Sequence, residues 1–204
     1  MIKADEALQR LQDGNKRFVA SIRGNKKAHI SSIPKNKDRQ NPFAIILGCS
    51  DSRVPAEIVF DQGMGDLFVI RVAGNIVAPS QLGSIEFALE NFGTQLVIVL
   101  GHSSCGAVSA TTNDIKHPGT QAYSNVFSIV DRIRPAVEPL FDTNLKHDDE
   151  ELLEAAIRAN ILASTNQLKH DSLLLETYIE QNKLKVVSAE YSISSGEVDF
   201  FDFI

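Results

Sequence analysis

Residues 43–55 read FAIILGCSDSRVP. Six apolar or small residues lead directly into Cys49, Asp51 and Arg53, which stand two positions apart. A continuous apolar run of this length is typical of a strand that is buried on both faces of a parallel sheet. Open parallel sheets bind their ligands beyond the carboxyl ends of the strands, so the three side chains are expected at a ligand site.

Two further apolar runs of the same kind follow, LFVIRV at residues 67–72 and QLVIVLG at residues 95–101. Between them, residues 79–93 place apolar side chains at helical spacing and end in Gly93, a residue typical of a helix C-terminus. A strand, a helix and a strand in succession predict a parallel crossover. The fold class is therefore predicted as α/β, with a mainly parallel β-sheet flanked by helices.

The rest of the chain adds helices and a C-terminal strand pair. Residues 4–20 have helical periodicity, and the basic, irregular residues 21–42 complete an N-terminal helical arm. Further predictions are a helix that begins near Cys105, a helix over 123–140 broken by Pro135 and Pro139, a helix over 148–170, a helix after a cap at Asp171 or Ser172, and a hairpin of 185–193 with 197–203.

The composition argues against a nucleic-acid-binding, membrane-spanning or exported protein. The 204 residues carry a net charge of −6, which is unfavourable for binding nucleic acid. Apolar runs fall short of the roughly 18–20 residues that a membrane span needs, and the first residues show no signal-peptide pattern. We therefore expect a cytoplasmic protein, with no membrane partner, whose two cysteines are reduced.

The third apolar run leads into GHSSCGAV, which contains His102 and Cys105. Parallel strands end at the same edge of a sheet, so Cys49, Asp51, His102 and Cys105 should meet there. Two thiolates, an imidazole and a carboxylate form a tetrahedral set suited to zinc, whereas an iron–sulfur cluster would normally have four cysteines. The competing interpretation is that the cysteines are two small buried hydrophobes.

Arg53 helps to decide whether such a site leaves one coordination position of the metal free for water. A metal held by all four side chains would be structural, because catalysis requires a free coordination position. Arg53 offers Asp51 a bidentate partner, so Asp51 can leave the metal and water can replace it. The alternative is that Arg53 merely supports Asp51 near the metal.

Three stretches closely resemble the β-class carbonic anhydrases: CSDSRVPAEIVFDQGMGDLFVIRVAGNIV from Cys49, LGSIEFALENFG from Leu82 and LGHSSCGAV from Leu100. A looser similarity covers nearly the whole chain. It implies one β-carbonic-anhydrase-like domain over 1–204, composed of an N-terminal helix and arm (1–42), a zinc-site core (43–110) and helices with C-terminal strands (111–204). It also implies zinc-dependent reversible hydration of CO2 to bicarbonate and a proton by metal-bound hydroxide, in a homodimer or homotetramer.

The resemblance also implies roles for individual residues. Cys49, His102 and Cys105 resemble the permanent ligands of one Zn²⁺ per chain. Asp51 ligates zinc in the family's closed form and pairs with Arg53 in its open form. The implied substrate-binding residues are Gln40, which hydrogen-bonds substrate or bicarbonate, the backbone N–H of Gly106, and the pocket lining of Phe68 and Phe87, which come from a partner subunit. Because CO2 is small, apolar and uncharged, Ala73 is expected to complete this lining.

The chain departs from its relatives at two positions. Many relatives have tyrosine where Phe87 stands, and relatives inhibited by bicarbonate at a separate site have tryptophan where Ile46 stands. That separate bicarbonate site is therefore not expected here. Arg71 and Asn75 are expected to organise loops, and the four other histidines are expected to be surface groups: His29, His117, His147 and His170.

Three other functions fit the same residues. One is a zinc-stabilised scaffold whose site is permanently closed. Another is a hydrolase or thiol redox protein that uses Cys49 as a nucleophile with His102. The last is a related lyase or hydrolase that acts on a molecule similar to CO2, such as carbonyl sulfide or carbon disulfide.

Overall fold

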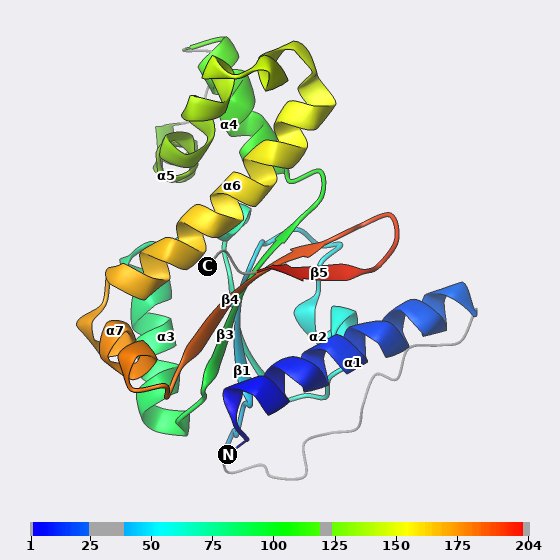
Figure 1. Ribbon diagram of the computed structural model, residues 1–204, viewed down its shortest axis with the longest axis vertical. Coiled ribbons are helices and arrows are strands. Elements are labelled where there is room, and N and C mark those ends of the chain that lie inside the picture. The colour runs from blue at the N-terminus through cyan, green and yellow to red at the C-terminus, as the bar shows by residue number, and fades with distance from the viewer. Residues whose placement is uncertain (1, 25–38, 119–123, 202–204) are drawn as a thin grey trace.

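A computed structural model describes residues 2–24, 39–118 and 124–201. Its sheet has the strand order β2-β1-β3-β4-β5, and only the β4–β5 pair is antiparallel. The strands are β1 (Ala44–Gly48), β2 (Leu67–Arg71), β3 (Leu96–His102), β4 (Lys185–Tyr191) and β5 (Val198–Phe201). The predicted mainly parallel α/β sheet is confirmed, as is its C-terminal hairpin (Figure 1).

Helices cover both faces of this sheet (Figure 1). The α-helices are α1 (Ala4–Arg23), α2 (Ala56–Val59), α3 (Pro79–Phe92), α4 (Gly106–Lys116), α5 (Phe127–Val137), α6 (Asp149–His170) and α7 (Leu173–Glu180). Short 3₁₀ helices are η1 (Ala73–Asn75), η2 (Ser124–Val126), η3 (Glu138–Asp142) and η4 (Asn144–His147). Across the three described ranges, we find no helix with the length and apolar character needed to cross a membrane.

The two faces explain why the central strands are apolar throughout. Ile45 and Leu47 of β1 pack in the cluster that contains α3 to α7, whereas Ala44 and Ile46 pack in the cluster that contains α1 and α2. Strand β3 alternates in the same way, and all seven of its residues are buried. A strand covered on both sides has no solvent face and therefore needs no polar alternation.

Several helix ends follow the predicted chemistry. Gly93 ends α3 in the left-handed conformation, with φ 63°, where glycine has no Cβ to clash. Ser172 caps α7 by accepting a hydrogen bond from the Leu175 N–H at 3.3 Å. Asp148 caps α6 by accepting from the N–H groups of Glu150 and Glu151.

Other local predictions need correction. The predicted helix over 123–140 is divided among η2, α5 and η3, and Pro135 lies inside α5 instead of breaking it. Pro135 has no N–H to donate within α5, and the α-helix ends two residues later at Val137, where η3 continues as a 3₁₀ helix. The single turn of α2 was not predicted, because four residues are too few to show a helical period. Most of the predicted arm, residues 25–38, lies outside the described residues.

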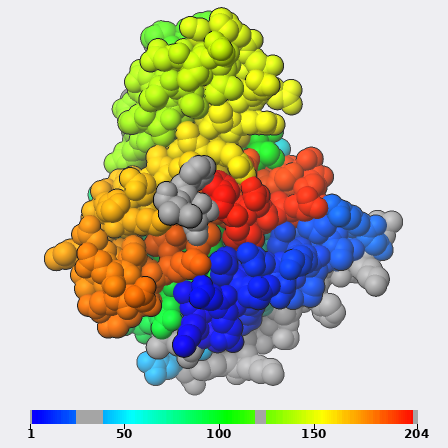
Figure 2. Space-filling model, in the orientation of Figure 1, coloured from blue at the N-terminus to red at the C-terminus, as the bar shows by residue number. Residues whose placement is uncertain are grey.

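Helix α1 is tied to the body of the protein by one buried amide. The side chain of Asn15 donates to the carbonyl oxygens of Val59, at 3.1 Å, and Gly196, at 2.9 Å, and accepts from the Val198 N–H at 2.9 Å. Figure 2 shows α1 lying against the C-terminal strand segment. These bonds join the N-terminal helix to both α2 and the β4–β5 hairpin.

Gly14→Ala is expected to destabilise the fold by roughly 1–3 kcal/mol. An added Cβ would lie 1.9 Å from the backbone oxygen of Phe60, so α1 would have to move away from α2. Urea unfolding measures the change. Lys16→Ala on the exposed side of the same helix is the control and should change the free energy of unfolding by about 0.5 kcal/mol or less. Equal stability of the two variants would contradict the close packing of α1.

Candidate metal centre

The site is built at the carboxyl ends of two neighbouring parallel strands. Gly48 of β1 pairs with Leu100 of β3, so Cys49 and His102 both follow at the same edge of the sheet. Cys105 comes three residues after His102, directly before α4. The two sulfurs and one ring nitrogen lie within 4.8 Å of one another, and all three residues are buried. The prediction that these loops meet at one sheet edge is confirmed.

The hydrogen bonds of His102 show which of its ring nitrogens faces the cysteines. Its Nδ1 lies 2.9 Å from the carbonyl oxygen of Ser103. A carbonyl oxygen can only accept, so Nδ1 carries a proton, and in the neutral imidazole Nε2 then has a free lone pair. Nε2 is buried and finds no hydrogen-bond partner among the described residues. Metal-ligating histidines commonly have this arrangement, and the residues present therefore fit a zinc ion.

The two thiols influence each other's ionisation. The neighbouring thiol of Cys105, which can donate a hydrogen bond to the sulfur of Cys49, lowers the pKa of Cys49 despite its burial. The hydrogen bond to Cys49, together with burial, raises the pKa of Cys105. The pair therefore tends to share one proton and one negative charge. A divalent cation would replace that proton and stabilise both sulfurs as thiolates.

Asp51 and Arg53 form a bidentate ion pair beside the cluster. Arg53 donates from Nη2 to Asp51 Oδ2 at 2.7 Å, and from Nε to Oδ1 at 3.0 Å. This hydrogen-bonded guanidinium holds the pKa of the Asp51 carboxyl well below its usual range. Asp51 Oδ2 lies 3.9 Å from His102 Nε2. The carboxylate is thus next to the cluster but engaged with Arg53.

Two further residues fix the backbone and sulfur of Cys49. Arg71, at the end of β2, donates from Nε to the carbonyl oxygen of Cys49 at 3.0 Å and from Nη2 to that of Asp51. Arg71 thus organises this loop, as expected. The N–H of Gly74 in η1 donates to Cys49 Sγ at 3.4 Å. The sequence analysis missed the role of Gly74.

The predicted substrate-binding residues fall into two groups. Ala73 precedes Gly74 in η1, and Gly106 begins α4 directly after Cys105, so both are near the cluster in the chain. Phe68 lies near the amino end of β2, three residues before Arg71, and its ring centroid is 6.4 Å from that of Phe87. These aromatic residues lie away from the site of their own chain.

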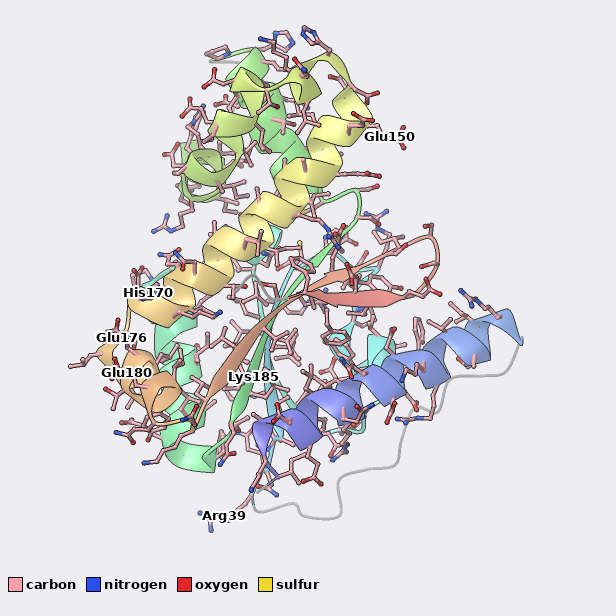
Figure 3. All side chains as sticks on the ribbon, viewed as in Figure 1. Arg39, Glu150, His170, Glu176, Glu180 and Lys185 are labelled. Carbon is pink, nitrogen blue, oxygen red and sulfur yellow. The ribbon has the colours of Figure 1, made fainter. Side chains whose placement is uncertain are left out.

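Gln40 is also distant from this site. It is exposed and precedes β1, whereas Cys49 follows the other end of that strand. In Figure 3 its neighbour Arg39 lies at the end of the molecule opposite Glu150 of α6. Of the other histidines, His117, His147 and His170 are exposed as predicted, and His29 lies outside the described residues.

Comparison with known proteins places this site in a family. A family model described as carbonic anhydrase matches residues 44–198. The carbonic anhydrase of Mycolicibacterium smegmatis is 36% identical over 193 residues, which cover 95% of this chain and 91% of that protein.

Solved structures share the fold. A β-carbonic anhydrase of the fungal pathogen Aspergillus fumigatus has a TM-score of 0.73 at 25% identity, and the match covers 92% of this chain and 87% of that one. A chain from a study of two tetrameric β-carbonic anhydrases of the filamentous ascomycete Sordaria macrospora has a TM-score of 0.72 at 22% identity. That match covers 81% of this chain and 83% of that one. The family match and the fold, together with a Cys-His-Cys cluster that could hold a metal, show that this chain belongs to the β-carbonic anhydrases.

Proposed function

We propose that the protein is a zinc enzyme that reversibly hydrates CO2 to bicarbonate and a proton. The observation that carries this proposal is the buried, unpartnered Nε2 of His102, which faces the thiols of Cys49 and Cys105. Together with its membership of the carbonic anhydrases, this donor set favours one catalytic zinc per chain. Three protein ligands leave the fourth position of a tetrahedral site free.

Each residue of the cluster then has a defined task. Cys49, His102 and Cys105 would hold the zinc, which supplies Lewis acidity that lowers the pKa of water to roughly 7. Arg53 keeps Asp51 away from the fourth position by binding both of its carboxylate oxygens. The lowered pKa of Asp51 keeps it ionised throughout pH 6–9, so it can accept a hydrogen bond and orient the attacking group. Asp51 would thus act as both acceptor and gate.

The remaining pocket must accommodate a small, uncharged, apolar molecule. Ala73 would provide part of an apolar wall, and the N–H of Gly106, the first residue of α4, would donate to an oxygen of the product. Gln40, Phe68 and Phe87 lie elsewhere on the chain, so in this proposal they act at the site of a second subunit. A homodimer is therefore the smallest catalytic unit that we propose, and the tetramers of Sordaria macrospora are consistent with further assembly. We also propose a cytoplasmic location, where the thiols stay reduced.

The proposed dimer gives Phe87 a measurable role. The residue is 51% exposed and packs with Phe68 and Phe92 in an aromatic cluster. Phe87→Glu should dissociate the dimer and lower hydration, because a charge would be buried at an apolar contact. Sedimentation velocity reports the mass. Leu173→Glu, at a residue 80% exposed on α7, is the control and should leave the mass unchanged. A fully active Phe87→Glu dimer would contradict this interface.

Removal and return of the metal tests the proposed function itself. Dialysis against a strong zinc chelator should abolish CO2 hydration, and one equivalent of zinc per chain should restore it, because the reaction needs the acidified water. Full activity after complete zinc removal would contradict the proposal and favour a cysteine nucleophile. Zinc-dependent turnover of carbonyl sulfide or carbon disulfide without CO2 hydration would favour the related lyase.

A further inference from the structure

Helix α6 carries a polar residue at a position where an apolar one is expected. Asn160 is only 2% exposed and lies one helical turn after the buried Ala156. Asparagine is unfavourable in the interior of a helix, and a buried amide destabilises the protein unless it is hydrogen-bonded. Its Nδ2 donates to the carbonyl oxygen of Gly74 at 2.8 Å. This bond connects α6 to η1 across 86 positions of sequence.

Gly74 links that amide to the candidate metal centre. While its carbonyl oxygen accepts from Asn160, its own N–H donates to Cys49 Sγ at 3.4 Å. The residue has φ 69°, and an added Cβ would lie 2.7 Å from Ile133 Cδ1 and 3.1 Å from Ala107 Cβ. Gly74 is therefore packed closely against Ile133 and Ala107, and Asn160 holds its carbonyl oxygen.

The next residue of α6 contacts the other ligand-bearing strand. A Cβ added to Gly101 would lie 2.4 Å from Ile161, so α6 packs directly on β3 one residue before His102. Figure 3 labels Glu150 and His170 at the two ends of α6, which crosses the molecule between them. Two consecutive residues in the middle of this helix thus contact η1, whose Gly74 N–H donates to Cys49, and β3, which carries His102.

We propose that Asn160 is a positioning residue that acts through Gly74 on the sulfur of Cys49. By holding the Gly74 carbonyl, it aims the Gly74 N–H at the sulfur. An N–H donor withdraws electron density from a thiolate and reduces its donation to a bound metal, and such outer partners tune metal sites. This inference rests on the proposed metal site, although it concerns the sulfur and not the substrate.

Cobalt substitution provides a readout besides activity. The full-length protein is loaded with Co²⁺, and the thiolate-to-cobalt charge-transfer band is compared between wild type and Asn160→Leu. Without the bond from Asn160, the sulfur should become more electron-rich and the band should shift to lower energy. Zinc affinity, measured by competition with a chelator, should fall roughly 10-fold or more, because the sulfur is no longer held in its ligating position and this loss outweighs its stronger donation.

Thr165→Val is the matched control. Thr165 is also buried in α6, and the valine variant loses two hydrogen bonds of its hydroxyl, to the Ile161 carbonyl oxygen at 2.9 Å and to Ser188 Oγ at 2.8 Å, neither of which involves η1. Its band and zinc affinity should equal those of wild type even if its stability falls. Asn160→Ala, which introduces a strong helix former and adds no bulk, provides the second test if the leucine variant fails to fold.

The possible results separate the two proposals. An unshifted band and unchanged zinc affinity in the Asn160 variants would overturn the positioning role and leave only a structural one. Equal shifts in the Asn160 variants and in Thr165→Val would also overturn it, because they would reflect general loosening of α6. A wild-type protein that takes up neither cobalt nor zinc would instead overturn the metal site on which the proposed function depends.

Discussion

Cys105→Ser is expected to lose stoichiometric zinc and to hydrate CO2 no faster than buffer. The wild-type cluster offers three ligand atoms within 4.8 Å, and serine replaces a thiolate by a hydroxyl that stays protonated at neutral pH. Two remaining protein ligands are too few for a stable tetrahedral zinc site. Metal analysis after gel filtration, together with stopped-flow hydration, measures both losses.

The matched control for Cys105→Ser is Val108→Ala, which removes buried side-chain volume but no candidate metal ligand. Val108 is 1% exposed and lies in the first turn of α4, close in sequence to Cys105. Val108→Ala should lower stability by roughly 1–3 kcal/mol because of the cavity, yet retain zinc and activity. Equimolar zinc and a wild-type rate in Cys105→Ser would show that this thiol is not a ligand.

Arg53→Ala is expected to keep zinc but lose roughly 10- to 100-fold in hydration rate. In the structure both carboxylate oxygens of Asp51 are bound by Arg53, and Oδ2 is only 3.9 Å from the ring nitrogen that would hold zinc. Without the guanidinium, Asp51 is free to become a fourth ligand and close the site. Stopped-flow assays on protein of known zinc content measure the effect.

The pH profile shows whether the lower hydration rate of Arg53→Ala comes from the new position of Asp51 or from a change in the charge of Asp51. Arg53 lowers the pKa of Asp51, and removing the Arg53 side chain should return the pKa of Asp51 only to the ordinary value of about 4. Asp51 is then ionised at pH 6–9 in both proteins, so protonation cannot explain the loss. Arg10 lies on α1 and pairs with Asp66, which directly precedes β2. Arg10→Ala removes this ion pair and should keep the wild-type rate. A fully active Arg53→Ala would exclude the gate.

The strands and the metal cluster could be predicted because their signals are local. The apolar runs that become β1, β2 and β3 identify fully covered strands, and their polar ends identify the edge where Cys49, His102 and Cys105 meet. Parallel pairing then requires that these ends share one edge. No distant contact was needed for this part of the prediction.

The surroundings of the cluster depend on distant parts of the chain and were therefore missed. Gly74 contacts Cys49 across 25 positions, and Asn160 contacts Gly74 across 86. The available signal was an asparagine on the apolar face of a helix, which indicates a buried hydrogen bond but not its acceptor. Likewise, the distance of Gln40 from Cys49 follows only from the direction of β1, because the two are merely nine positions apart in sequence.

CO2 hydration measured from pH 6 to 9, on protein of quantified zinc content, shows whether this cluster is a catalytic zinc site. With about one zinc per chain, we expect a rate that rises through pH 7 to 8.5, because a zinc held by these ligands would lower the pKa of water into the neutral range. A rate equal to buffer at every pH, with zinc fully bound, would contradict it and favour a permanently closed scaffold or another substrate.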